Sequence, residues 1–248
     1  MVRKARRRRL LAEPMTPEWK AILDRNIPLY QRLPEELKRQ LEGLVNVFLS
    51  EKRFEGCGGQ EINDEVKVTI AGQACMLLLN RETKYFPRLY TIYVYPATYV
   101  ARQLTSNGWI DGQTRMGESW RYGPVVLAWN SVTGGANNIH DGQNIVFHEF
   151  SHQLDQEDGA ADGAPILESR GCYATWAKVL SAEYEKLQRK AKKGRKTVLH
   201  RYGATAPAEF FAVATEAFLE KPKQMKRKIP ELYEELKNYY KLDPVEWA

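Results

Sequence analysis

Apolar residues recur at helical spacing along most of this chain. Amphipathic helical patterns run from residue 16 to about 49, with breaks at Pro28 and Pro34, and a buried helix is predicted over 68–79. Further helical patterns cover residues 171–191, 209–219 and 230–241. The chain is therefore predicted to be mostly helical.

Two segments have the composition of β-strands. Residues 89–95 and 124–130 are rich in β-branched and aromatic side chains, and the first of them stops at Pro96. Glycines within residues 54–62 and 134–138 instead predict turns or loops. A few strands among many helices place the chain in the α+β class.

The start of the chain differs in composition from the rest. Residues 3–9 hold six of the 37 basic residues, including the run Arg6–Arg9. We predict a basic flexible tail over residues 1–15 and a single domain over residues 16–248, of which residues 16–50 form a helical N-terminal extension. A chain of 248 residues with 43% hydrophobic content is long enough to bury one large core.

The net charge of +6 suggests a nucleic-acid partner, but the distribution of the charge argues against one. The basic tail and a second basic cluster over residues 189–196 lack the interleaved aromatic side chains and the motifs of nucleic-acid-binding modules. Both segments are interpreted as solvated surface. No nucleic-acid partner is expected.

Membrane-spanning and disulfide-rich classes are also disfavoured. The longest apolar runs are far shorter than the ~20 residues that cross a bilayer, and no leader with a cleavage site opens the chain. Cys57, Cys75 and Cys172 are far apart and form no CxxC motif, which predicts reduced thiols. We expect a cytoplasmic protein with no membrane partner.

The run NIVFHEFSHQLD contains HExxH, the zinc signature of metallopeptidases. On a helix, His148 and His152 lie one turn apart on the same face, so both imidazoles can bind one metal ion. Glu149 lies beside them, where it can move protons. Asp141 is a predicted N-cap of this helix, and Gly159 is a predicted stop.

A catalytic zinc ion usually takes three protein ligands, so the two histidines need a partner. Four residues are candidates: Asp158, at the spacing of a known extended motif but without the glycine of that motif; Asp155, one turn after His152; His140, in the preceding loop; and Glu209, on a later helix. Spacing alone leaves this choice open.

The motifs HEFSHQLD and YGATAPAEFFAVATEAF together resemble the Mlc titration factor A family of zinc-dependent peptidases. The similarity continues through YPATYV, GESWRYGPVVLAW and the C-terminal DPVEW. The metal core of that family is similar to the catalytic domain of anthrax lethal factor. The resemblance implies a zincin-like metallopeptidase domain, with a small mixed sheet beside the HExxH helix.

The resemblance also implies roles for particular residues. Glu209 would complete a site for one Zn²⁺ per chain with His148 and His152, and Tyr202 would lie in the active site. The implied function is a peptidase acting on peptides or proteins, with aminopeptidase action as one form, in which Glu149 is the general base for a zinc-activated water. The alternative is a regulatory protein that sequesters a transcriptional repressor of the Mlc type.

The orientation of the histidines needs a further acidic residue. Many HExxH enzymes with a distant Glu ligand carry an acid four positions after it, where this chain has Val213. Glu216 shares the helix face of Glu209, and Asp155 shares that of His152. Either acid is a candidate to hold a histidine ring by a hydrogen bond.

Overall fold

The computed structural model describes residues 2–105, 108–115, 117–119 and 123–248. Residues 120–122, within the segment GESWRYGPVVLAW, lie outside the described residues. In the part of the chain that the structure describes, the α-helices are α1 (Val2–Ala12), α2 (Pro17–Asn26), α3 (Pro28–Arg32), α4 (Glu35–Glu51), α5 (Asp64–Met76), α6 (Trp129–Asn137), α7 (Ile145–Asp155), α8 (Cys172–Lys192), α9 (Pro207–Glu220), α10 (Pro222–Lys228) and α11 (Pro230–Tyr240). Short 3₁₀ helices are η1 (Gln156–Asp158), η2 (Arg201–Ala204) and η3 (Pro244–Glu246).

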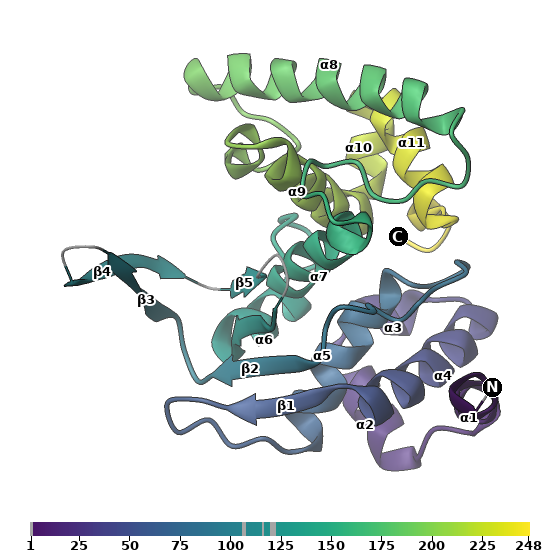
Figure 1. Cartoon of the computed structure of the whole chain (residues 1–248). Helices are drawn as coiled ribbons and strands as arrows, with labels where there is room; N and C mark the ends of the chain where they lie inside the picture. Colours follow the sequence, from purple (N-terminus) through teal and green to yellow (C-terminus); the bar gives the residue numbers. More distant parts are fainter. Residues whose placement is uncertain (1, 106–107, 116, 120–122) are drawn as a thin grey trace.

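The strands form one mixed sheet and one hairpin. They are β1 (Arg53–Gly56), β2 (Thr91–Tyr95), β3 (Tyr99–Thr105), β4 (Gly108–Arg115), β5 (Gly117–Ser119) and β6 (Val125–Ala128). In the sheet of order β1-β2-β6-β5, the first three strands are parallel and β5 is antiparallel to β6. The strands β3 and β4 pair separately as an antiparallel hairpin, which projects away from the body of the molecule (Figure 1). The α+β fold with a small mixed sheet is confirmed.

The helices lie in two groups with α7 between them (Figure 1). The helices α1 to α5 form one group with β1 and β2, and α8 to α11 form the other. The helix α7 packs against α5 on the first side and against α9 on the second. The HExxH helix therefore runs through the centre of the fold, where its position is fixed from both sides.

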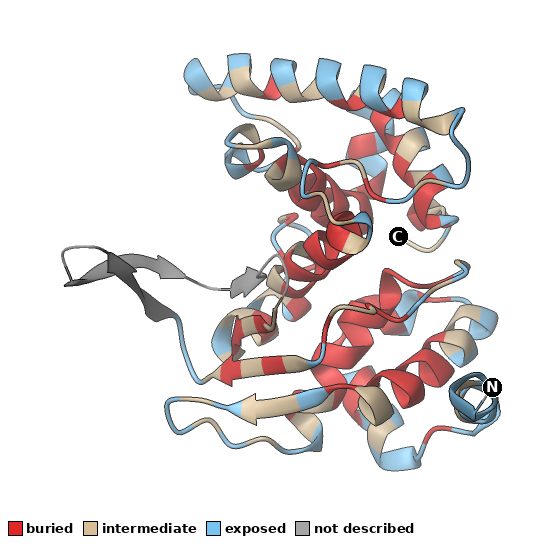
Figure 2. Cartoon of the chain, in the orientation of Figure 1, coloured by how far each residue is buried: buried red, intermediate tan, exposed pale blue. Residues whose placement is uncertain are grey.

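Burial follows the same arrangement, since buried residues concentrate on α4, α5, α7 and α9 (Figure 2). Phe150 of α7 is part of an aromatic cluster with Phe48 of α4 and Phe86, which precedes β2. The ring centroids lie 4.9 Å apart for Phe86 and Phe150 and 5.8 Å apart for Phe48 and Phe150. Aromatic pairs at such separations favour tilted and edge-to-face geometry, which helps to fix α7 against the first group.

The first residues of the chain form α1 rather than the predicted flexible tail. Arg3 and Arg7 bind the carboxylate of Glu51 at 2.8 and 2.7 Å, and the guanidinium of Arg7 lies 4.3 Å from the centre of the Tyr85 ring. The helices α1 and α4 approach closely at Gly43 of α4, where a Cβ would lie 2.6 Å from the backbone oxygen of Leu11. Mutual repulsion of the arginines suggested disorder, but arginine is a good helix former and α4 supplies the opposite charge.

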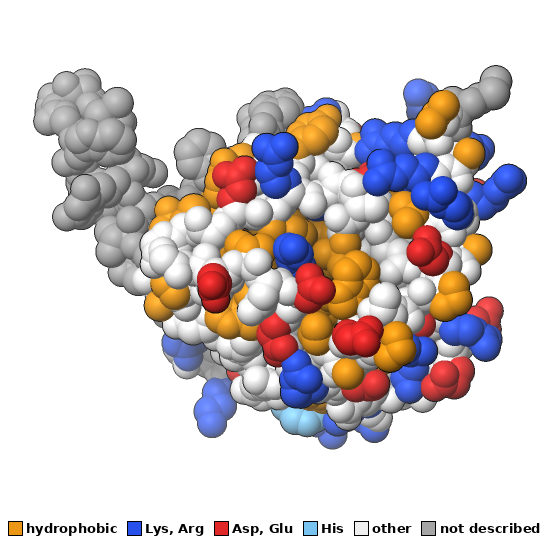
Figure 3. Space-filling view, turned by 90° about the horizontal axis from the view of Figure 1, so that it is seen from below, with side chains coloured by type: hydrophobic (Ala, Val, Ile, Leu, Met, Phe, Trp, Pro, Cys, Tyr) orange, Lys and Arg blue, Asp and Glu red, His pale blue; other side chains and the backbone are white. Residues whose placement is uncertain are grey.

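The basic side chains of α1 gather at one edge of the underside of the molecule (Figure 3). No residue of α1 is buried. This helix therefore lies on the surface of the fold and contributes little to its core.

One of the two loop predictions was wrong, and the other holds for most of its residues. Residues 134–138 belong largely to α6, because the glycines there allow close packing instead of a turn: a Cβ on Gly135 would lie 3.1 Å from the Cα of Asn144. The segment over residues 54–62 begins inside β1, whose four residues are too few for a clear pattern, but residues 57–62 form the predicted turn and loop, with Gly58 and Gly59 at positive φ. The predicted strands at β2 and β6 and the predicted helices at α5, α8, α9 and α11 are confirmed, with ends shifted by a few residues.

Candidate active site

The HExxH helix begins at Asn144 rather than at the predicted Asp141. The side-chain oxygen of Asn144 accepts hydrogen bonds from the backbone N–H groups of Val146 and Phe147, both at 3.1 Å. Its side-chain amide donates to Gln73 of α5 at 2.9 Å, deep in the core. The N-terminus of α7 is thus capped and tied to a neighbouring helix. Gly159, in the left-handed conformation with φ 101°, follows the end of the helix as predicted.

The two histidines lie one turn apart on α7, and their ring centroids are 4.9 Å apart. The ring planes cross at 84°, so the two Nε2 atoms approach one region of space from different directions. Their side chains are largely buried, with 12% and 11% exposed for His148 and His152. A helical spacing of four residues brings them together, as expected from the motif.

Glu209 enters from the first turn of α9, which begins with Pro207. Its Oε2 atom lies 2.9 Å from Nε2 of His148 and 3.5 Å from Nε2 of His152. One ligand atom from each of the three residues lies within 4.8 Å of those of the others. Donor atoms around a tetrahedral zinc ion at ~2.0–2.2 Å are roughly 3.3 Å apart, so these side chains fit such an ion.

Charge and hydrogen bonding are strongly coupled at this centre. Burial raises the pKa of Glu209, but hydrogen bonds from His148 and His152 outweigh burial and lower that pKa to about 2. Burial lowers the pKa of His148, and its hydrogen bonds to Glu209 and Glu216 outweigh that effect, so the pKa lies well above the usual value. Metal binding requires a neutral imidazole, so a metal ion and a proton compete for His148.

Glu216 lies behind the first histidine. Its Oε1 atom is 2.6 Å from Nδ1 of His148, and its Oε2 atom accepts the backbone N–H of Asn144 at 2.8 Å. A carboxylate on Nδ1 fixes the ring so that Nε2 faces Glu209. Of the two acids proposed to orient a histidine, Glu216 is therefore the one in contact with His148.

Asp155 serves another segment of the chain. Its Oδ2 atom accepts the backbone N–H of Gly163 at 3.0 Å, and its Oδ1 atom is buried with no hydrogen-bond partner among the described residues. Burial raises its pKa to about 6. The other two candidates for the third ligand, Asp158 and His140, are both exposed, and neither belongs to the metal-ligand group.

Tyr202 lies on η2, and its ring centroid is 5.9 Å from that of His148. The side chain of Tyr202 is half exposed, and its backbone N–H is capped by Nδ1 of His200 at 3.4 Å. Gly203 lets η2 pack closely on α9, because a Cβ there would lie 3.2 Å from the Cβ of Val213. The structure thus brings Tyr202 beside the histidines, although it lies 54 residues after His148 and 50 residues after His152 along the chain.

Glu149 is buried, with 4% of its surface exposed, and its charge contributes to the raised pKa of His148.

Three polar residues near the site had no role assigned from the sequence: Gln73, Asn144 and Glu220. Glu220 accepts the backbone N–H of Gln143 at 3.1 Å, and burial together with the charge of Glu216 raises its pKa to about 9. The sequence contains features that could have indicated two of them, because Gln73 interrupts an apolar helical run and Glu220 follows Glu216 by one helical turn.

Among the described residues, every helix is too short or too polar to cross a membrane.

Residues 2–241 match the family described as glucose-regulated metallo-peptidase M90. An uncharacterized protein of Synechocystis sp., slr2042, is 40% identical over 245 residues, which cover 97% of this chain and 89% of that protein.

Two further relatives carry the name Mlc titration factor A. The protein from Cronobacter sakazakii is 29% identical over 92% of this chain and 86% of its own length. The protein from Escherichia coli O7:K1 is 29% identical over 89% of this chain and 85% of its own length. With nearly the whole sequence matched and the three ligand side chains gathered between α7 and α9, the chain belongs to the M90 family of glucose-regulated metallopeptidases.

Proposed function

We propose that this protein is a zinc peptidase in which His148, His152 and Glu209 hold the metal. The observation that carries the proposal is the approach of Glu209 to both histidines from a separate helix, in a chain of the M90 family. Two imidazoles and one carboxylate form a donor set common to catalytic zinc sites. When bound, zinc supplies a Lewis acid that polarises a carbonyl group and makes water acidic near neutral pH.

Three further side chains have separate roles in the proposed hydrolysis. Glu149 accepts a proton from the attacking water and passes it to the leaving amine. Tyr202 donates a hydrogen bond to the substrate carbonyl oxygen as negative charge develops there. Glu216 holds the ring of His148 in one orientation throughout, since its contact is with Nδ1 on the far side from Glu209.

The sheet offers a place for the substrate backbone. Among the described residues, β5 is the last strand of the sheet, and it packs against α7. An extended peptide that paired with the free edge of β5 would lie alongside the HExxH helix. We therefore propose a peptide or protein substrate bound in extended form, with aminopeptidase action as the form to be tested first.

Replacing Glu149 by Gln tests this mechanism. The variant should retain bound zinc, because Glu149 is not a ligand, and should lose about 10²- to 10⁴-fold in kcat, because the amide cannot accept the proton. Zinc content and hydrolysis of chromogenic amino-acid amides, with N-terminally blocked peptides alongside, give both readouts. Glu168→Gln is the matched control, since Glu168 is exposed and pairs with Lys241. Full activity in Glu149→Gln would exclude the mechanism.

A second candidate function is binding of a transcriptional repressor of the Mlc type. It is supported by the two relatives named Mlc titration factor A, at 29% identity. Calorimetric titration of the Glu149→Gln protein with a purified repressor of this type from the same host tests it. A saturable one-to-one complex would support the second function, and no heat of binding at micromolar concentrations would exclude it.

A further inference from the structure

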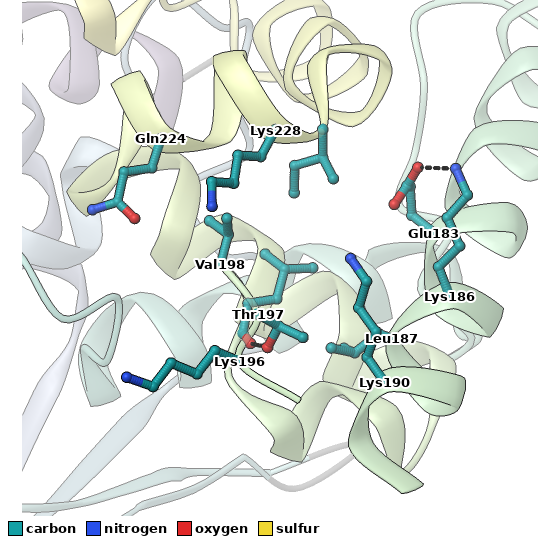
Figure 4. Close-up of a pocket in the computed structure, with 11 residues that line it drawn as sticks. Glu183, Lys186, Leu187, Lys190, Lys196, Thr197, Val198, Gln224 and Lys228 are labelled. Carbon is teal, nitrogen blue, oxygen red and sulfur yellow. Dashed lines mark hydrogen bonds and ion pairs between the residues drawn. The ribbon is translucent and has the colours of Figure 1, made fainter. Parts of the chain in front are cut away.

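A second site lies away from the metal ligands, in a pocket between α8, α10 and the segment over residues 196–199 (Figure 4). Its volume is about 320 Å³, which is enough for a small molecule. The floor is apolar, since Leu187 and Leu199 are almost fully buried and Ile229 lies beside them. The rim carries Glu183 and four lysines: Lys186, Lys190, Lys196 and Lys228.

The positive charge of this rim is only partly compensated. Glu183 binds Lys186 at 2.6 Å, and no acidic side chain among the described residues pairs with Lys190 or Lys228. Figure 4 shows the ammonium groups of Lys190 and Lys228 pointing into the pocket from α8 and α10. Like charges that converge on one cavity create a positive potential there, and an anion bound between them removes the repulsion.

We propose that this lysine pocket binds a small molecule that carries a phosphate monoester. A lysine ammonium group binds phosphate as a compact point charge, and two such groups at one cavity match the nearly double negative charge of a phosphate monoester. The described residues that line the pocket include lysines and no arginine. The apolar floor accommodates the organic part of the molecule, and the Gln224 side chain adds a polar group at the rim.

The pocket is connected to the candidate active site through the backbone. Residues 196–199 lead directly into His200, which caps Tyr202. Lys221, between α9 and α10, donates a hydrogen bond to the backbone oxygen of Val198 at 3.2 Å. A ligand that drew this segment toward α10 would act on Tyr202 through the His200 cap. This effect on catalysis rests on the proposed peptidase function, whereas binding itself does not.

Calorimetry with phenyl phosphate as the probe tests the binding site. We expect the full-length protein to bind it, and the Lys190→Ala/Lys228→Ala variant to bind it about tenfold more weakly. The matched control is Lys192→Ala/Lys193→Ala, which removes the same charge from the exposed end of α8 without touching the pocket. Binding should also weaken as salt is raised, because the lysines are exposed.

Three outcomes would overturn the proposal: no binding by the unaltered protein at millimolar concentration, equal binding by both double variants, or equally tight binding of phthalate, an aromatic dianion without phosphorus. A second measurement follows peptide hydrolysis with and without phenyl phosphate. A change in kcat in the unaltered protein that disappears in Lys190→Ala/Lys228→Ala supports the connection to Tyr202. Calorimetry needs no turnover, so a failure of the peptidase assay leaves the binding result intact.

Discussion

The two ends of α7 are each held by a buried acid, but the two acids differ in how completely they are bonded. At the N-terminal end, both oxygens of Glu216 have partners, and Asn144 links that carboxylate to the helix cap and to Gln73. At the C-terminal end, Asp155 has one bonded oxygen and one buried oxygen without a described partner. A buried charge is stabilised only when its hydrogen bonds are made, so the carboxylate at the first end is fully bonded, whereas burial raises the pKa of the carboxyl group at the second end.

The largest effect on the free energy of unfolding is expected from removing the hydrogen bonds at the N-terminal end of α7. Asn144→Ala removes the cap of α7 and leaves the side-chain oxygen of Gln73 buried without its donor. The two losses together should lower the free energy of unfolding by roughly 2 to 4 kcal/mol. Urea denaturation followed by circular dichroism measures it. Asn137→Ala, an exposed change near the end of α6, is the control, and equal stability of both variants would show that the cap is unimportant.

Glu216→Gln tests the same end through metal binding. The two donors meet different oxygens of Glu216, and Gln has an NH2 group in place of one of them, so one of the two donors would face another donor. Loss of such a supporting hydrogen bond typically weakens metal affinity about 10- to 100-fold. Competition with a zinc chelator measures this, with Glu185→Gln on the exposed side of α8 as the control. Unchanged affinity in Glu216→Gln would mean that the ring of His148 needs no support.

The smallest effect on the free energy of unfolding is expected at the C-terminal end of α7, where Asp155 is less completely bonded. Burial raises the folded-state pKa of Asp155 to about 6, above its value in the unfolded chain, so the folded protein binds the extra proton. Its contribution to stability is therefore present at low pH and is lost as the pH rises from about 4 to about 6, by at most ~3 kcal/mol. Asp155→Asn, which stays neutral, should remove this component.

The measurement is the free energy of unfolding of metal-free protein from pH 4 to pH 7, compared between Asp155→Asn and the unaltered chain. Asp24→Asn, an exposed change of the same type on α2, should follow the unaltered chain. A constant difference between Asp155→Asn and the unaltered protein over this range would show that Asp155 does not titrate as its surroundings indicate.

The sequence predicts these two ends unequally. The HExxH spacing, the helical pattern of α9 and the family resemblance together indicate His148, His152 and Glu209, because local periodicity determines which side chains share a helix face. The choice between Glu216 and Asp155 depends on how α7 and α9 cross, which no local pattern specifies. Asn144 was missed as the cap because Asp141 and Gly142 give an equally good local signal three residues earlier.

The same limit explains the errors in the fold. The helix α1 was predicted as a tail because its partner, Glu51, lies 44 residues away from Arg7 along the chain. The helix α6 was predicted as a loop because its glycines were interpreted as turn residues rather than as contact points. Both errors arise where a distant segment decides the structure, whereas the strands β2 and β6 and the long amphipathic helices, which depend on local pattern, were predicted correctly.

Two glycines, Gly135 and Gly203, limit how the protein can be altered. Gly135 sets the distance between α6 and the start of α7, and Gly203 sets the distance between η2 and α9. Any side chain at either position would push apart backbones that carry the candidate catalytic groups. Libraries intended to change substrate preference should therefore leave both glycines untouched and direct variation to solvent-facing positions, where added volume meets only water.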